Sequence, residues 1–259
     1  MKNPWLHRCA ILLAIFALTV VALGALLTGE TRTFPGAPAS TVSAPSLEQA
    51  HRIAGYALAI LTLGLAIWAR SLAGWIALAA VIVESLSTGV PVVHAFDAQV
   101  FFSLVVATAV LTSKSWQAGP KPVESQWKPL QRLAMAIPFL VFLQIGLGAA
   151  LRHNSMGVIW HILNAMIVLL VIMVAGIFVL RQYPEHPSLR PAALALVIVT
   201  GVQVLLGFTV YMVLLISSEN NTGLIITGVL HVANGSLTLA ASVVLAMQMQ
   251  RNLIQLSGV

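Results

Sequence analysis

Four histidines stand in or at the ends of long apolar stretches, where an imidazole is a candidate metal ligand. Ionisable side chains in such segments are costly and are functional candidates by default. Two imidazoles that face each other across a helical bundle suit the axial positions of heme iron, whereas zinc would need three or four ligands in one cluster. For any one histidine alone, a hydrogen bond between helices is an equal alternative. The four are His51, His94, His161 and His231.

Carboxylates and an arginine accompany the first two histidines. Glu48 precedes His51 by three residues, so on a helix the two share a face, about 4.5 Å apart along the axis. Glu48 would then point at the edge of a porphyrin bound by His51; alternatively, it is a helix-start residue favoured by the helix dipole. Arg52 either pairs with a heme propionate or extends to the surface. Asp97, three residues after His94, either orients an imidazole or makes a polar contact between helices.

The composition indicates an integral membrane protein. Of the 259 residues, 59% are hydrophobic and only 8% are charged, against about a quarter charged in a soluble domain. The net charge is +6, but the basic residues lie in short loops between apolar runs, which indicates membrane topology and not nucleic-acid binding. Cys9 is the only cysteine, so no intrachain disulfide and no cysteine-based metal site is expected. We interpret the first apolar run as an uncleaved helix and not as a signal peptide.

Eight apolar stretches are candidates to cross a bilayer, which takes about 20 residues. Residues 87–91 separate the third and fourth stretches by a turn only, so these two form a tight helical hairpin. We predict an all-α integral membrane protein with eight transmembrane helices in two pseudo-symmetric four-helix bundles. Residues 1–113 form the N-terminal half, 114–128 a cytoplasmic linker and 129–259 the C-terminal half. The stretches are 9–28, 49–69, 72–90, 91–113, 129–151, 157–180, 190–216 and 222–249.

The distribution of positive charge sets the expected orientation, because loops rich in Lys and Arg stay in the cytoplasm. With eight spans, only Arg32, Arg52 and Arg152 fall on the outer side. We therefore expect a multi-pass protein of the cell inner membrane with both termini in the cytoplasm. The residues on the inner side are Lys2, Arg8, Arg70, Lys114, Lys121, Lys128, Arg132, Arg181, Arg190 and Arg251.

The chain repeats itself. VVALGALL (20–27), LQIGLGAALRH (143–153) and VQVLLGFTVY (202–211) resemble one another, and Gln144 and Gln203 each stand four residues before a glycine. After each such helix comes an outer loop and then a helix with a histidine near its outer end. Each half thus supplies one pair of histidines, and internal duplication in membrane proteins places sites between helices.

Four other ionisable residues receive no ligand role. His7 and His186 are expected to be solvated side chains of cytoplasmic segments. His153, beside Arg152, is expected at the surface or against a propionate, because His161 fits the repeat better. Glu84, near the outer end of the third stretch, stays ambiguous between orienting an imidazole and a polar helix contact.

Four short motifs, in order along nearly the whole chain, resemble the heme A synthase family of cytochrome oxidase assembly proteins. They are E-x-x-H-R at 48–52, P-V-V-H-A-F-D-A-Q-x-F-F at 91–102, L-G-A-x-L-R-H at 147–153 followed by W-H at 160–161, and L-H-V-A-N-G at 230–235. The resemblance implies two four-helix halves and the oxidation of one methyl group of heme O to the formyl group of heme A.

The resemblance also assigns residues. It implies a resident heme b in the C-terminal half with His161 and His231 as axial ligands, and we assign Arg152 to the same heme. It implies a substrate site for heme O in the N-terminal half, with His51 and His94 as ligands, Arg52 beside them and Glu48 as the catalytic carboxylate. Expected partners are an electron acceptor or quinone, heme O synthase or oxidase assembly proteins, and further copies or subunits in a larger complex.

One departure keeps a second function open. Many bacterial members of that family carry a cysteine pair in the first outer loop, and this chain has none there. The alternatives are a non-enzymatic di-heme b electron carrier and a heme-handling subunit of a respiratory complex. Glu48 discriminates between them and a synthase, since a carrier has no need of a carboxylate at the porphyrin edge.

Overall fold

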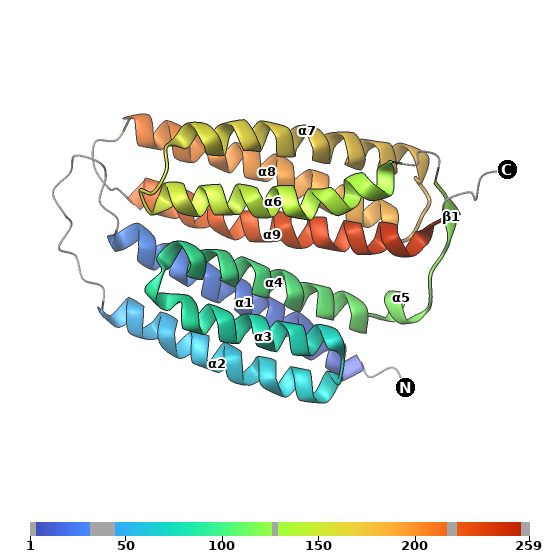
Figure 1. Cartoon of the computed structure of the whole chain (residues 1–259), viewed down its shortest axis with the longest axis horizontal. Helices are drawn as coiled ribbons and strands as arrows, with labels where there is room; N and C mark the ends of the chain where they lie inside the picture. Colours follow the sequence, from blue (N-terminus) through green and yellow to red (C-terminus); the bar gives the residue numbers. More distant parts are fainter. Residues whose placement is uncertain (1–3, 32–44, 126–128, 217–221, 255–259) are drawn as a thin grey trace.

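The chain folds almost entirely into helices (Figure 1). The computed structural model describes residues 4–31, 45–125, 129–216 and 222–254. Seven of the helices in these ranges are long and apolar enough to cross a membrane, so the all-α prediction is confirmed and a multi-pass membrane protein is indicated. These helices are α1 (Pro4–Thr31), α2 (Pro45–Ala69), α4 (Pro91–Thr112), α6 (Leu130–Arg152), α7 (Val158–Gln182), α8 (Leu189–Ile216) and α9 (Thr222–Asn252).

The third predicted span is shorter than expected. Helix α3 (Leu72–Leu86) has 15 residues, which is about 22 Å of helix against a hydrocarbon core of about 30 Å. It begins at Ser71, whose side chain accepts a hydrogen bond from the Gly74 amide at 3.2 Å. It ends where the Ser87 hydroxyl donates to the carbonyl oxygen of Glu84 at 2.9 Å. A 3₁₀ turn, η1 (Ser87–Gly89), leads into α4, and this connection is the tight hairpin that the sequence predicts.

The helices surround two hydrophobic cores. The first is built by α1 to α4, with Ala240 of α9 added. The second is built by α6 to α9, together with Val123, Tyr183 and Leu253, which lie outside these helices. Many large apolar side chains on the outer helix faces are exposed, among them Ile60, Phe139 and Leu170 at 65–70%. In a membrane these faces lie against lipid, so exposure does not destabilise them.

The two helix groups meet along α9, which packs against both α1 and α4 (Figure 1). At this interface the buried Ser236 hydroxyl donates to the side-chain carbonyl oxygen of Gln99. Gln99 stands five residues after His94, and Ser236 stands five residues after His231. The hydrogen bond therefore fixes the two histidine-bearing helices side by side.

The segment between the two halves has more structure than a polar linker requires. It contains a one-turn helix α5 (Lys114–Gln117) and a strand β1 (Val123–Glu124), which pairs in parallel with β2 (Leu253–Ile254) beyond α9. The Lys121 amide donates to the Asn252 side chain at 2.8 Å, and the Tyr183 hydroxyl donates to the Glu124 carbonyl oxygen at 3.0 Å. These bonds dock the segment onto the ends of α7 and α9.

The expectation of two solvated histidines is wrong. His186 is only 7% exposed, and its Nε2 lies 2.8 Å from the Lys121 carbonyl oxygen while its Nδ1 accepts from the Leu189 amide at 3.0 Å. Nδ1 of the half-buried His7 lies 3.0 Å from the Ala109 carbonyl oxygen. Both rings supply hydrogen bonds to backbone groups at helix ends. A sequence pattern does not reveal the Lys121 and Ala109 carbonyl groups, because they belong to segments far from these histidines in the chain.

Part of the predicted topology lies outside the described residues. Lys2, Arg32 and Lys128, which contribute to the charge argument for the orientation, lie outside the described residues. Most of the first predicted outer loop, residues 32–44, also lies outside them.

Candidate functional site

The structure pairs the four histidines as the repeat predicts. His51 of α2 faces His94 of α4, with ring centres 6.1 Å apart and ring planes at 88°. His161 of α7 faces His231 of α9, with ring centres 6.2 Å apart and planes at 72°. Each half therefore holds one pair of nearly perpendicular imidazoles, contributed by two different helices.

A glycine on a neighbouring helix accommodates three of the four rings. A Cβ atom added at Gly24 of α1 would lie 2.9 Å from Cε1 of His51. A Cβ at Gly148 or at Gly207 would lie 3.0 Å from Cε1 of His161 or His231, respectively. Any side chain at these positions would push the imidazole away. The repeated glycines of the sequence are thus explained by close packing of helix against ring.

In the C-terminal half each histidine is also held by a glutamine. The amide nitrogen of Gln144 lies 3.1 and 3.2 Å from the two ring nitrogens of His161 and donates to the His161 carbonyl oxygen at 3.0 Å. The amide nitrogen of Gln203 lies 3.2 and 3.3 Å from the ring nitrogens of His231. The two glutamines of the repeat therefore occupy equivalent places on their histidines.

The N-terminal half supports its histidines differently. His94 contacts Glu84 of α3 twice, with Nδ1 3.0 Å from the backbone carbonyl oxygen and Nε2 3.4 Å from a carboxylate oxygen. Asp97 has a buried carboxylate oxygen without a hydrogen-bond partner among the described residues, and Nδ1 of His51 is likewise buried without one. The carboxylate that contacts a histidine here is therefore Glu84, whose role the sequence leaves open between orienting an imidazole and a polar helix contact.

Glu48 and Arg52 lie on a different face of α2 from the paired ring of His51. Both side chains are exposed and line a shallow groove together with Gln49 and Tyr56. Among the described residues, no hydrogen bond or ion pair joins Glu48 to His51 or to His94, whose ion pair is with Glu84. The structure thus brings Glu48 and Arg52 together and leaves both outside the immediate surroundings of the histidine pair.

Arg152 lies between the two halves. Its guanidinium donates to the carbonyl oxygen of Ala25 in α1, the residue that follows the glycine against His51. Its two terminal nitrogens lie 3.7 and 3.8 Å from the places that a Cβ would take at Gly29 and Gly228. Arg152 therefore reaches from the end of α6 to both α1 and α9, and places a positive charge near His231 and beside Ala25, the residue after Gly24.

The separation of the paired rings fits an iron atom between them. A metal–nitrogen bond is about 2.0–2.1 Å and an imidazole centre lies about 1.1 Å behind the bonding nitrogen, so two axial rings have centres about 6.3 Å apart. The observed separations are 6.1 and 6.2 Å. Among the described residues, no group of three or more His, Cys, Asp or Glu side chains could hold a bare ion. The centre-to-centre distance of each pair thus matches the distance expected for two imidazoles on one metal atom.

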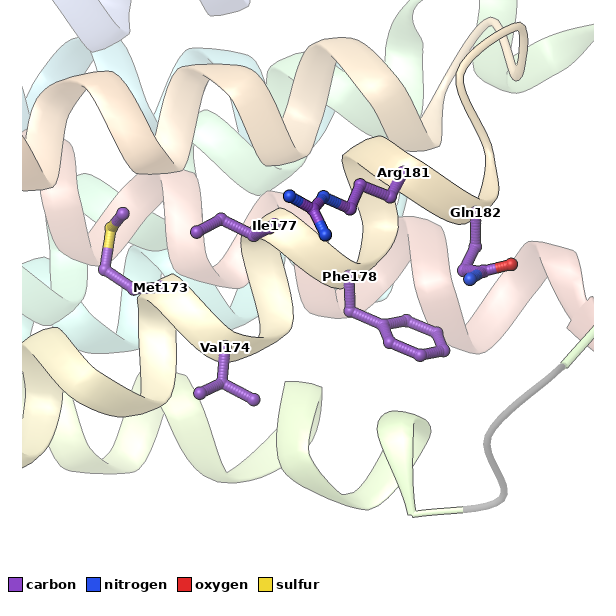
Figure 2. A pocket seen from close by; sticks show the side chains of 6 residues that line it. All are labelled: Met173, Val174, Ile177, Phe178, Arg181 and Gln182. Carbon is purple, nitrogen blue, oxygen red and sulfur yellow. The ribbon is translucent and has the colours of Figure 1, made fainter.

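A second groove lies far from the histidines, on the outer face of α7. Figure 2 shows its lining, with the apolar side chains of Val174, Ile177 and Phe178 and the polar ends of Arg181 and Gln182. It contains none of the residues that the sequence selects, and its surface is consistent with the edge of a membrane-facing helix.

Two functional candidates were missed by sequence reasoning. Asn164 and Asn234 each donate to the side-chain oxygen of the glutamine, Gln144 and Gln203 respectively, at 2.8 Å. The signal was present, since both asparagines stand three residues after a paired histidine in an H-x-x-N pattern. The two glutamines were noted only as markers of the repeat.

Comparison with known proteins adds no assignment. No protein-family model matches this sequence, and no curated protein matches it.

Proposed function

We propose that this chain is a membrane heme protein in which each histidine pair binds one heme iron. Eight helices cross the inner membrane in two pseudo-symmetric four-helix halves, with α3 as the shortest span and both termini in the cytoplasm. The observation that carries the proposal is the separation of 6.1 and 6.2 Å between the paired rings, in a chain that supplies no other metal-binding group among its described residues. All four histidines are half-buried between apolar helices, which agrees with a flat, apolar ligand.

The activity that we propose is that of a heme A synthase, the oxidation of a methyl group of heme O to the formyl group of heme A, with water as the oxygen source and the electrons passed to an electron acceptor or quinone. His161 and His231 hold a resident heme b, which supplies one-electron transfer when bound. His51 and His94 hold the substrate heme O. Arg152, whose guanidinium lies near His231 and beside Ala25, offers a positive charge to propionates, and Arg52 offers a second one at the N-terminal pair.

Glu48 is the proposed catalytic carboxylate, since it resembles the glutamate of the E-x-x-H-R motif. A carboxylate can stabilise positive charge that develops on the methyl carbon or accept a proton from the attacking water. To act in this way Glu48 must reach the porphyrin edge from its position on the exposed face of α2. Glu84 contacts both ring nitrogens of His94 and so supports that imidazole.

A second function has its own supporting observation. Glu48 is exposed and forms no hydrogen bond or ion pair with either N-terminal histidine among the described residues, and the first outer loop has no cysteine. Both features suit a di-heme b electron carrier, or a heme-handling subunit of a respiratory complex, better than a synthase. Such a protein binds heme at the same four histidines and performs no chemistry on the porphyrin.

Co-expression with a source of heme O distinguishes the two functions. Hemes extracted from the membranes are separated by chromatography and identified by mass. A synthase yields heme A, with heme B retained on the purified protein. Heme B without any heme A, at matched expression of the protein, rejects the synthase and favours the electron carrier.

The proposed topology has a separate test. Reporter enzymes that are active only in the cytoplasm or only in the periplasm are fused within residues 114–128 and within the outer loop before α9. The proposal expects a cytoplasmic signal from the first fusion and a periplasmic signal from the second. The reverse result rejects the orientation, and equal signals reject the odd number of spans, α6, α7 and α8, between the two loops.

A further inference from the structure

The glutamines of the C-terminal half contact the faces of the imidazole rings. In an imidazole the two nitrogens flank Cε1, so an atom nearly equidistant from both would overlap ring atoms if it lay in the ring plane. The amide nitrogen of Gln144 is 3.1 and 3.2 Å from the two nitrogens of His161, and must therefore lie over the ring face. Gln203 has the same position over His231, at 3.2 and 3.3 Å. An N–H group over an aromatic face is a weak attractive contact.

Each glutamine is fixed from behind. Asn164 donates to the side-chain oxygen of Gln144 at 2.8 Å and lies 3.5 Å from the carbonyl oxygen of Leu140. Asn234 donates to the side-chain oxygen of Gln203 at 2.8 Å and to a backbone carbonyl oxygen of α8, four residues before Gln203, at 2.9 Å. The hydrogen-bond pattern thus fixes which end of each amide faces the histidine.

The glycine of the repeat packs against the edge of the same imidazole ring. Gly148 and Gly207 lie against Cε1 of His161 and His231, and the glutamine one turn earlier covers the face of the same ring. The glycine backbone blocks movement of the ring edge toward the neighbouring helix, and the amide blocks rotation of the ring face. Both ring nitrogens keep their in-plane lone pair or proton, because the amide does not approach them in the plane.

We propose that Gln144 and Gln203, held by Asn164 and Asn234, are positioning residues that fix the ring planes of the C-terminal histidine pair. The inference rests on the proposed heme site and names residues that set its ligand geometry. The N-terminal half has no glutamine at the equivalent position. Val20 stands four residues before Gly24. The C-terminal imidazoles are thus preset for a permanently bound heme, while His51 keeps more rotational freedom.

The first experiment uses heme-free protein in lipid bilayers. Histidine is labelled with ¹³C and ¹⁵N, and solid-state NMR measures the order parameter of each Cε1–H bond, assigned by single histidine replacements. Gln144→Val and Gln203→Val copy the residue found in the N-terminal half, and each is expected to lower the order of the histidine beneath it. Gln182→Val, far from the site on α7, is the matched control. The converse variant, Val20→Gln, is expected to raise the order of His51.

The second experiment uses protein reconstituted with heme B. In low-spin ferric heme the angle between the axial ring planes determines the largest g value, so the Gln144→Val and Gln203→Val double variant is expected to broaden or shift that EPR signal while heme stays bound. Unchanged ring order in the heme-free variants together with an unchanged g value would overturn the proposal. If wild-type protein binds no heme, the proposed function fails, and the NMR measurement alone still decides whether the glutamines position the rings.

Discussion

The two halves of this molecule hold the same pair of imidazoles with different partners. In the C-terminal half both rings lie under amides, Gln144 and Gln203, that are themselves anchored by asparagines. In the N-terminal half His94 contacts a carboxylate, Glu84, while Nδ1 of His51 is buried without a hydrogen-bond partner in the part of the chain that the structure describes. The ring separations differ by only 0.1 Å between 6.1 and 6.2 Å. Helix packing therefore sets the distance between ligands, and the neighbouring polar side chains set how firmly each ligand is oriented.

Under the proposed function, this contrast matches different tasks of the two halves. A neutral amide support adds no charge and suits a cofactor that stays bound through many turnovers. A carboxylate beside His94, with no glutamine over His51, suits a heme that enters, reacts and leaves.

Removal of a C-terminal ligand has the largest expected effect. His161→Ala or His231→Ala should abolish the low-spin absorbance of the proposed heme b, because a single imidazole leaves one axial position of the iron open. Absorption spectra of purified protein, with membrane insertion checked on the same sample, make the measurement. His153→Ala is the control and keeps the heme. Wild-type spectra from both ligand variants would reject this site.

Glu48→Gln separates chemistry from binding in the N-terminal half. The amide has a similar size but cannot carry negative charge or accept a proton as a base, so heme A formation should fall by about 10²–10⁴-fold. Heme binding should persist, because His51 and His94 are untouched. Chromatography of hemes from co-expressing cells should show accumulated heme O or a hydroxylated intermediate. An unchanged yield of heme A would exclude Glu48 as the catalytic carboxylate.

A pair of glycines on α8 tests the close packing of helix against ring. A Cβ at Gly207 lies 3.0 Å from His231 Cε1, whereas a Cβ at Gly201 meets nothing within 4 Å. Gly207→Ala should therefore lower the heme content of the purified protein several-fold, since the ring must shift from its ligating position. Gly201→Ala should leave it unchanged. Equal heme contents in the two variants would mean that the glycine contact does not control the ligand.

The smallest expected effect concerns the carboxylate of the N-terminal half. Glu84→Gln replaces a charged support of His94 by a neutral one and so makes the first half resemble the second. The redox potential of heme bound at this pair should rise, because a carboxylate stabilises the ferric state more than an amide does. Potentiometric titration with absorbance detection should show this shift, while the potential of the C-terminal heme stays constant. A shift of both hemes would contradict independent support of the two pairs.

Hydropathy and repeats made the helices and the histidine pairing predictable, because both follow from local spacing along the chain. The expected position of Glu48 illustrates the limit. Three residues turn a helix by about 300°, which leaves Glu48 about 60° away from His51. Sequence spacing does not tell on which side of the ring that offset falls, and the structure places Glu48 in the exposed groove with Arg52.

Contacts between distant segments escaped prediction for a different reason. The parallel pairing of β1 with β2 joins residues 123–124 to residues 253–254, and two-residue strands leave no alternating pattern in the sequence. Asn164 and Asn234 did leave a pattern, but an asparagine in an apolar helix has many uses. Only the structure shows that each holds the side-chain oxygen of a glutamine.

The most direct test of the account is the ligation state of heme in the purified wild-type protein. Near-infrared magnetic circular dichroism of the oxidised protein identifies axial ligands by the energy of a charge-transfer band, and pyridine hemochrome analysis gives the heme content. The account predicts low-spin, bis-histidine heme, including heme B that is lost in His161→Ala and His231→Ala. Protein that folds into the membrane without heme, or whose heme has any other ligand pair, would contradict it.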